Sequence, residues 1–167
     1  YCFTSCTFNG TLTLGNGLQT IRESAFGGNQ SLVGDLTIPV TVTSLGASAF
    51  SGNVGFNRHL TIDSGINIPF ACFYDCRNFS KLTIAEGVNI IGESAFENLS
   101  SITGNLKLPN SITSIGARAF FGCSKIDGYL SLGPNITSIG DCAFVKSIDS
   151  EEIIQEKERL STDPDMD

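Results

Sequence analysis

The residues best suited to chemistry in this chain of 167 residues are its six cysteines. Four of them form two pairs with the same spacing, Cys2 with Cys6 and Cys72 with Cys76, and each pair flanks a phenylalanine. Paired cysteines at short spacing form disulfides, bind zinc or fill small buried positions as thiols. Which of the three applies here depends on the elements that position them.

Other candidates for catalysis or metal binding are few. The only histidine, His59, follows Arg58 and has no cysteine or carboxylate motif beside it, so we interpret it as a solvated surface residue. The sequence has no glycine-rich phosphate loop, GxSxG motif or HExxH motif. None of its 17 acidic residues stands out as a catalytic pair. We therefore predict a protein that is not an enzyme and has no cofactor.

The elements that position these residues come from an internal repeat. A Leu-x-Leu or Leu-x-Ile segment recurs six times at intervals of 22 to 24 residues, beginning at Leu12, Leu36, Leu60, Leu82, Leu106 and Leu130. A phenylalanine follows each segment at a nearly constant distance, at Phe26, Phe50, Phe73, Phe96, Phe120 and Phe144. Residues 2–8 match the second half of one further unit.

This period predicts a solenoid of about six units over residues 1–144, wound right-handed. Each Leu-x-Ile segment is expected to be a short parallel strand with its aliphatic residues inward, ended in two units by Pro39 and Pro109. A glycine after the second apolar pair, as at Gly116, is expected to allow a sharp corner. The Ala-Phe segment has helical spacing and predicts a single helical turn. The third unit is shorter, which predicts a distorted coil at 66–81.

The solenoid limits what the cysteines can do. Three coils, about 15 Å, separate the Cys2/Cys6 pair from the Cys72/Cys76 pair, so the four cannot share one zinc ion. A disulfide within each pair stays open, as do buried thiols. We favour thiols, because other units place non-cysteine residues at the second position of the pair, namely Asn29, Asn53 and Leu99.

The repeat closely resembles the BspA-like leucine-rich repeats. The clearest copy is LKLPNSITSIGARAFFGCSKI, from Leu106 to Ile126, and the resemblance covers about residues 2–144. This family is found in surface and secreted proteins of anaerobic bacteria and parasitic protists. The resemblance implies an extracellular or cell-surface location and adhesion to a host matrix protein, another cell-surface protein or a glycan. It implies no enzymatic activity.

The charge is concentrated at one end of the sequence. The net charge is −7, which argues against nucleic acid as a partner, and no apolar run is long enough to span a membrane. Residues 145–167 carry eight acids and three bases, a net charge of −5. We expect a helix over about 150–160, beginning after Ser150, as a cap or as a linker to another domain, and then a disordered end.

Two surfaces are candidates for binding. The outward middle residues of the strands form a column of mostly hydroxyl side chains: Thr13, Thr37, Thr61, Thr83, Lys107 and Ser131. The column before it contains His59, Lys81 and Tyr129. The second surface holds two aromatic residues, Tyr74 and Phe121, expected to point outward about two coils apart. Solvated strand positions and scattered surface aromatics explain the same residues without function.

We predict that the chain is a non-catalytic binding module that presents the strand face for adhesion to a protein or a glycan. The alternative is a structural spacer in a larger surface protein, with the ligand bound elsewhere. A third hypothesis, ice binding, requires a regular flat threonine array, which Lys107 and the mixed neighbouring column interrupt.

Overall fold

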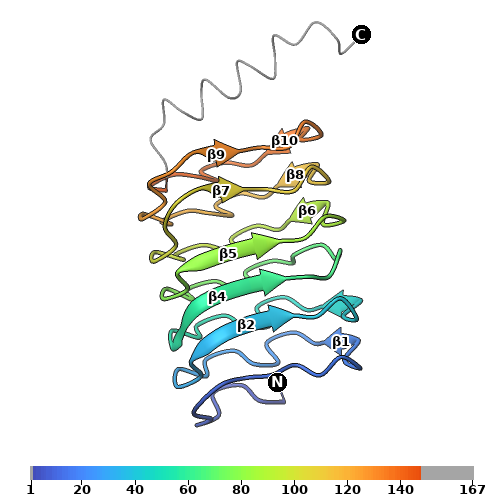
Figure 1. Cartoon of the computed structure of the whole chain (residues 1–167), viewed down its shortest axis with the longest axis vertical. Coiled ribbons are helices and arrows are strands. Elements are labelled where there is room, and N and C mark those ends of the chain that lie inside the picture. The colour runs from blue at the N-terminus through green and yellow to red at the C-terminus, as the bar shows by residue number, and fades with distance from the viewer. Residues whose placement is uncertain (1, 148–167) are drawn as a thin grey trace, which may run out of the picture.

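The computed structural model describes residues 2–147, which form a solenoid of parallel strands stacked coil on coil (Figure 1). The strands in front run in one direction while the chain climbs from the N-terminus, so the coil is right-handed as predicted. The predicted helix over about 150–160 and the predicted disordered end lie outside the described residues. The boundary at 144 stays a prediction.

One face of the solenoid, which we call the sheet face, contains the Leu-x-Ile segments. Its strands are β2 (Gly34–Ile38), β4 (Phe56–Ile62), β5 (Lys81–Ile84), β7 (Leu106–Lys107) and β9 (Leu130–Ser131). The first three form one parallel sheet and the last two form another. Equivalent residues pair across the coils, so that Thr61 lies opposite Thr37 on one side and Thr83 on the other.

A second face contains two-residue strands from the middle of five units: β1 (Thr20–Ile21), β3 (Ser44–Leu45), β6 (Ile90–Ile91), β8 (Ser114–Ile115) and β10 (Ser138–Ile139). β1 pairs with β3, and β6, β8 and β10 form a separate sheet. The third coil has no strand between them and contributes only an isolated bridge from Ile68 to Ile91. This break confirms the predicted distortion of the short third unit.

Seven phenylalanine rings stack in one column through the core: Phe3, Phe26, Phe50, Phe73, Phe96, Phe120 and Phe144. Neighbouring ring centroids are 5.2 to 5.6 Å apart, and all six pairs are stacked. Phe73 keeps its place in the column although its unit is short. The missing residues therefore disturb the second face and leave the core in register.

The Ala-Phe segment does not form the predicted helical turn, and the structure has no helix within residues 2–147. In the first coil the N–H of Ala25 bonds to the Arg22 oxygen, and the N–H of Gly27 bonds to the Ser24 oxygen. The two turns share Ser24, which has φ of 50°. Alternate N–H groups instead bond to the next coil, as Phe26 does to Ala49 at 2.8 Å. Because Ser24 is left-handed, successive N–H groups point alternately into the turn and toward the next coil. The segment therefore adds to the backbone hydrogen bonds that join neighbouring coils.

The corner glycines serve a purpose that differs from the predicted one. Gly46, Gly116 and Gly140 do not have the positive φ for which glycine is usually needed. A Cβ on Gly116 would stand 2.4 Å from the backbone nitrogen of Glu93 in the coil below, and Gly46 and Gly140 are equally crowded. Glycine is required there because two backbones approach closely.

Candidate binding surface

The cysteines are thiols within the described residues, with no disulfide in either pair. Cys76 and Cys123 lie in a buried column whose other members are Asn29, Asn53, Leu99 and Ser147. The polar members donate hydrogen bonds to backbone carbonyls of the phenylalanine column, as the Cys76 thiol does to the Phe50 oxygen at 3.0 Å. Burial raises the pKa of Cys76 and that of Cys123 to about 12. These thiols therefore stay protonated and unreactive near neutral pH.

No group of three or more His, Cys, Asp or Glu side chains within residues 2–147 is arranged to hold a metal ion. Nor does this part of the chain contain a helix long and apolar enough to cross a membrane. His59 is half-buried, and its Nε2 lies 2.8 Å from the Thr83 hydroxyl of the next coil. Its backbone N–H donates to the Asp35 carboxylate at 3.0 Å.

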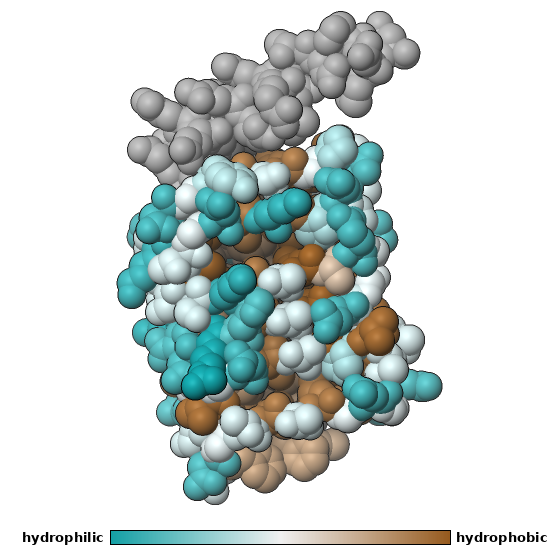
Figure 2. All heavy atoms as spheres, viewed as in Figure 1, coloured by the Kyte–Doolittle hydropathy of each residue, from teal (hydrophilic) through white to brown (hydrophobic). Residues whose placement is uncertain are grey.

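The predicted hydroxyl column lies on the outside of the sheet face. Figure 2 shows hydrophilic side chains spread across this face, with apolar groups visible between them. Four members are exposed and the other two, Thr61 and Ser131, are half-buried. Thr83 is the only member whose side chain has a hydrogen bond to another described residue. The other hydroxyl groups therefore have no bond within the solenoid to lose when a ligand docks.

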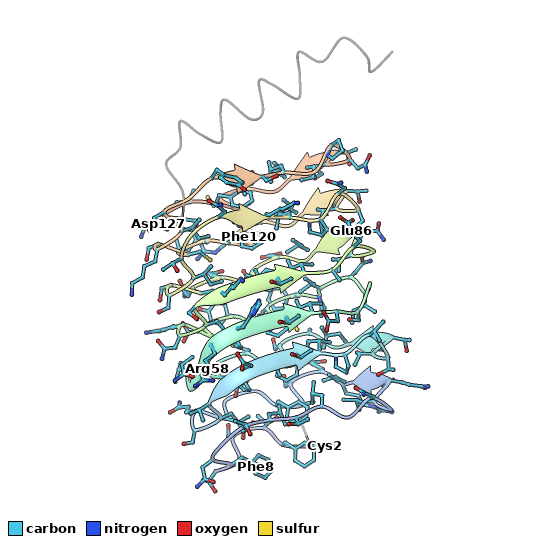
Figure 3. The ribbon with its side chains drawn as sticks, viewed as in Figure 1. Cys2, Phe8, Arg58, Glu86, Phe120 and Asp127 are labelled. Carbon is cyan, nitrogen blue, oxygen red and sulfur yellow. The ribbon has the colours of Figure 1, made fainter. Side chains whose placement is uncertain are left out.

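Side-chain hydrogen bonds link two steps of the neighbouring column, whose members are Thr11, Asp35, His59, Lys81, Asn105 and Tyr129. The side-chain oxygen of Asn105 accepts the Tyr129 N–H at 3.1 Å, as Asp35 does for His59. Tyr129 is 59% exposed. Figure 3 shows Arg58 near the start of the strands and Glu86 beyond their ends, so charged side chains flank the face on both edges.

Within residues 2–147, a lower and an upper hollow interrupt the sheet face. The lower hollow, of about 370 Å³, lies between the first coil and β2 and is bordered by Pro39. The upper hollow, of about 380 Å³, lies between β5 and β7 and is bordered by Pro109. In their own units, both prolines stand at the repeat position that Ala85 holds in the fourth unit. Ala85 donates its N–H to the Ile62 oxygen of the coil below, at 2.8 Å. Proline has no N–H to donate, so the ladder opens at these two steps.

The aromatic surface is less continuous than predicted. Tyr74 is exposed, but Phe121 is half-buried beneath cations, with the Arg118 guanidinium 4.1 Å from its ring centroid. Glu97, from the coil between them, is buried and ion-paired with Arg118, whose hydrogen bond lowers the pKa of the Glu97 carboxyl. The two aromatic residues are therefore separated by an ion pair and do not form one apolar patch.

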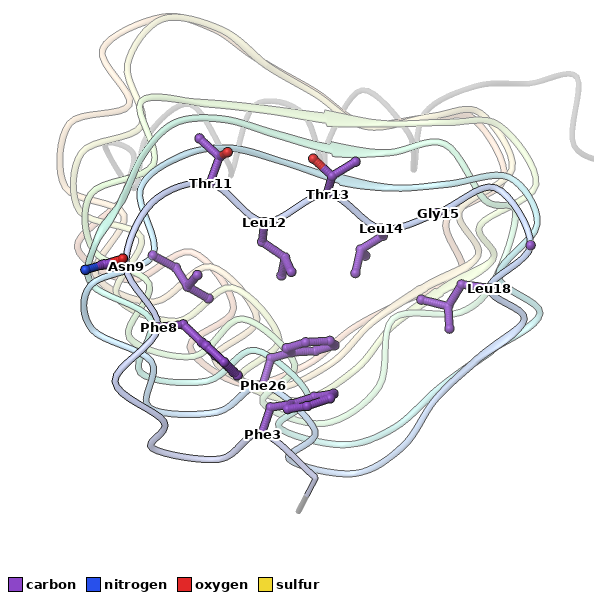
Figure 4. Close-up of a pocket in the computed structure, with 12 residues that line it drawn as sticks. Phe3, Phe8, Asn9, Thr11, Leu12, Thr13, Leu14, Gly15, Leu18 and Phe26 are labelled. Atoms are coloured by element: carbon purple, nitrogen blue, oxygen red, sulfur yellow. The ribbon is translucent and has the colours of Figure 1, made fainter.

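A further hollow, of about 710 Å³, opens onto the apolar core at the first coil. Figure 4 shows Phe3, Phe8, Leu12, Leu14 and Phe26 around it, all pointing toward the inside of the coil. Its lining side chains belong to the inward apolar columns that form the core in the other coils. This hollow is therefore part of the apolar core, whereas the hollows on the sheet face lie among outward side chains.

The sequence pattern alone does not predict the lower and upper hollows of the sheet face or the contribution of Glu86 to the upper one. The signal was present, since Pro39 and Pro109 stand at the same position of two units. They were expected to end strands, and β2 and β7 do end before them. Their effect on the ladder between coils requires knowledge of which way each N–H points.

The repeat is also detected by comparison with known proteins. A family model described as BspA type Leucine rich repeat region matches residues 1–126 and 100–163, with six copies. A search of curated proteins finds no match.

Three solved structures have the same fold. A leucine-rich repeat protein from Bacteroides ovatus is 24% identical with a TM-score of 0.73, and the match covers 87% of this chain and 37% of that one. The T. pallidum leucine-rich repeat protein is 20% identical with a TM-score of 0.62, covering 89% and 81%. A leucine-rich cell surface protein from Faecalibacterium prausnitzii is 23% identical with a TM-score of 0.52, covering 83% and 45%.

This chain thus spans little more than a third of the Bacteroides protein and less than half of the Faecalibacterium protein. At these identities the structures agree in fold, while the family match rests on the sequence itself and covers most of the chain. The chain belongs to the BspA-type leucine-rich repeat family, whose repeats are generally non-catalytic modules of a protein-binding or adhesion type.

Proposed function

We propose that the sheet face is an adhesion surface for a protein or a glycan outside the cell, and that the chain does no catalysis. The observation that carries this proposal is the outward column of the sheet face, which is mostly hydroxyl and includes Lys107, with Lys81 and Tyr129 in the column beside it. Hydroxyl and ammonium groups without partners inside the fold are available to a ligand at little cost.

A location at the cell surface is part of the same proposal. It is supported by the Faecalibacterium structure, which is described as a cell surface protein. The partner classes we expect are host matrix proteins, other cell-surface proteins and glycans, and we expect neither nucleic acid nor insertion into a membrane. A nearly neutral solenoid favours recognition by hydrogen bonds and short contacts over long-range charge attraction.

The test is binding of the purified chain to immobilised fibronectin, fibrinogen, mucin and a glycan array. The double variant Thr61→Lys/Thr83→Lys places two long side chains over the hydroxyl column and should weaken binding of a protein partner without unfolding the protein. Its matched control, Thr43→Lys/Thr113→Lys, adds the same charge on the second face and should bind like the parent.

Equal binding by the parent and both variants would move the site to the surface around Tyr74 and Phe121. A chain that binds no member of the panel would overturn the proposal in favour of a structural spacer. A thermal-hysteresis assay of the parent tests the third hypothesis, ice binding, and is expected to be negative because Lys107 interrupts the threonine column.

A further inference from the structure

The two hollows on the sheet face have equivalent linings except for their charge. In the upper hollow, three of the outward lining positions hold Lys81, Asn105 and Lys107. In the lower hollow, the same positions hold Thr11, Asp35 and Thr37. The backbone makes two hollows of nearly equal size, about 380 and 370 Å³, and the side chains make one of them cationic.

The two lysines of the upper hollow are available to an external anion. The ion pairs of the described residues are Arg77 with Asp75 and Arg118 with Glu97, so neither lysine is paired. Both lysines are exposed.

Glu86, the one carboxylate that lines the upper hollow, is already engaged. Its two oxygens accept the backbone N–H groups of Asn110 and Ser111, at 3.1 Å each. Both carboxylate oxygens are thus held at the turn that follows Pro109, and the two lysines outnumber this one negative charge. The upper hollow therefore keeps two unpaired cations beside a carboxylate that is otherwise occupied.

The rest of the upper hollow can form hydrogen bonds with a polar ligand. No backbone hydrogen bond joins residues 81–84 to residues 105–108, whereas every other step of the sheet face from β2 to β9 is paired. N–H and C=O groups that pair elsewhere therefore border the opening. The exposed Tyr129 lies in the next coil, and its backbone N–H donates a hydrogen bond to the side-chain oxygen of Asn105. Its aromatic ring is the side chain at this edge best suited to pack on a sugar.

We propose that the upper hollow binds a glycan through one anionic group, a carboxylate or a sulfate, held between Lys81 and Lys107. This inference rests on the proposed function of the sheet face and names its ligand class. A volume of about 380 Å³ is within the range of small-ligand sites, roughly 300–1,000 Å³. The net charge of −7 disfavours a dense polyanion, while a glycan with an isolated anion brings one charge to one cationic spot.

The test measures binding of 3′-sialyllactose, 3′-sulfolactose and lactose to the full chain by calorimetry. The first two probes separate a carboxylate from a sulfate, and lactose lacks the anion. At least one anionic sugar should bind more tightly than lactose, and added salt should weaken that binding. The double variant Lys81→Thr/Lys107→Thr, which adopts the residues of the lower hollow, should lower the affinity about tenfold, since two exposed ion pairs are lost.

The matched control is Arg22→Thr/Lys125→Thr, which removes the same charge from exposed positions outside the hollow and should leave the affinity unchanged. Equal binding of all three sugars, binding of none, or equal losses in both double variants would overturn the inference. If the parent binds the panel but binds neither anionic sugar more tightly than lactose, only this inference fails. If the parent binds neither the sugars nor the panel, the proposed function fails with it.

Discussion

Single glycine residues allow neighbouring coils to approach each other at positions where no side chain fits. Gly116 is the clearest case, because its Cα faces the backbone of the coil below with no room for a Cβ. The corner glycines recur at one position of the repeat, so the spacing between coils is fixed at the second face as well as in the core.

Gly116→Ala should therefore destabilise the protein by about 3 kcal/mol, because the new Cβ would stand 2.4 Å from the Glu93 nitrogen. The measurement is the free energy of unfolding in urea. Gly17→Ala is the matched control, since a Cβ at Gly17 has nothing within 4 Å, and its cost should be within about 0.5 kcal/mol. Equal stability of the two variants would contradict the role of close backbone approach.

The buried thiols give a second expectation at this scale. The pKa of Cys76 and that of Cys123 are raised from an ordinary value near 9 to about 12. Between pH 9 and 12 the unfolded chain loses these two protons and the folded chain keeps them. The free energy of unfolding should therefore fall as the pH rises, by about 1.4 kcal/mol per pH unit for each thiol.

The double variant Cys76→Ser/Cys123→Ser tests this expectation, because Ser147 already fills the same column and donates to the Phe120 oxygen. The variant keeps the hydrogen-bond donors and removes the ionisation. Urea unfolding from pH 8 to 11 should give a shallower decline for the variant than for the parent. Parallel declines would mean that the thiols do not govern alkaline stability.

At the scale of the strand, two prolines decide where the sheet face opens. Pro39 and Pro109 occupy a position that donates a ladder hydrogen bond in the third and fourth coils, through Asp63 and Ala85. Without this N–H donor, the backbone oxygen that would accept the bond in the coil below has no ladder partner. The same substitution recurs in two units, and so does the hollow.

Pro109→Ala should restore the missing donor to the Ile84 oxygen, as Ala85 donates to the Ile62 oxygen at 2.8 Å. Hydrogen exchange should then show a protected amide at residue 109 and slower exchange along β7. Pro134→Ala is the control, because Pro134 is exposed and lies one residue beyond the ladder position, so its new amide should exchange freely. Free exchange at residue 109 would show that the proline does not cause the opening.

Most of the fold could be predicted from the sequence because each coil repeats the same apolar positions. The Leu-x-Ile segments, the phenylalanine column and the distortion of the third coil all follow from spacing alone. The Ala-Phe turn was predicted as helical because helical spacing and a turn with one left-handed residue place the same apolar side chains inward. The helical turn and the turn with one left-handed residue differ only in the direction in which each backbone N–H points.

The sequence predicts which residues of the candidate site point outward, but it does not predict the hollow between them. Strand alternation shows that Thr37, Lys81 and Lys107 point outward, and the structure places them so. The upper hollow depends on a missing hydrogen bond between two coils, and no pattern within one unit reveals it. Likewise, the partial burial of Phe121 depends on Arg118, a cation that sequence analysis did not associate with it.

At the scale of the whole molecule, the stacked phenylalanine column joins all the coils. Phe96 lies in the middle of the column, 5.6 Å from Phe73 and 5.2 Å from Phe120 between ring centroids. Because a repeat protein is stabilised mainly by contacts between neighbouring coils, loss of one central ring weakens both flanking interfaces.

Phe96→Ala should cost about 3–5 kcal/mol and unfold several coils together. Thermal melting followed by circular dichroism is the measurement. Phe70→Ala, at a ring that is 54% exposed, serves as the control and should change the stability by no more than about 0.5 kcal/mol. A Phe96→Ala protein that melts like the parent would contradict the stacked core.

The central claim is that the solenoid is a scaffold for binding by the sheet face. The most direct measurement is a nuclear magnetic resonance titration of the full chain with the tightest binder of the panel, with backbone amides assigned. If the sheet face binds the ligand, the largest chemical-shift changes should cluster on β4, β5 and β7, around Thr61, Thr83 and Lys107. Changes centred on Tyr74 and Phe121, on the second face or at the open end of the core would contradict it.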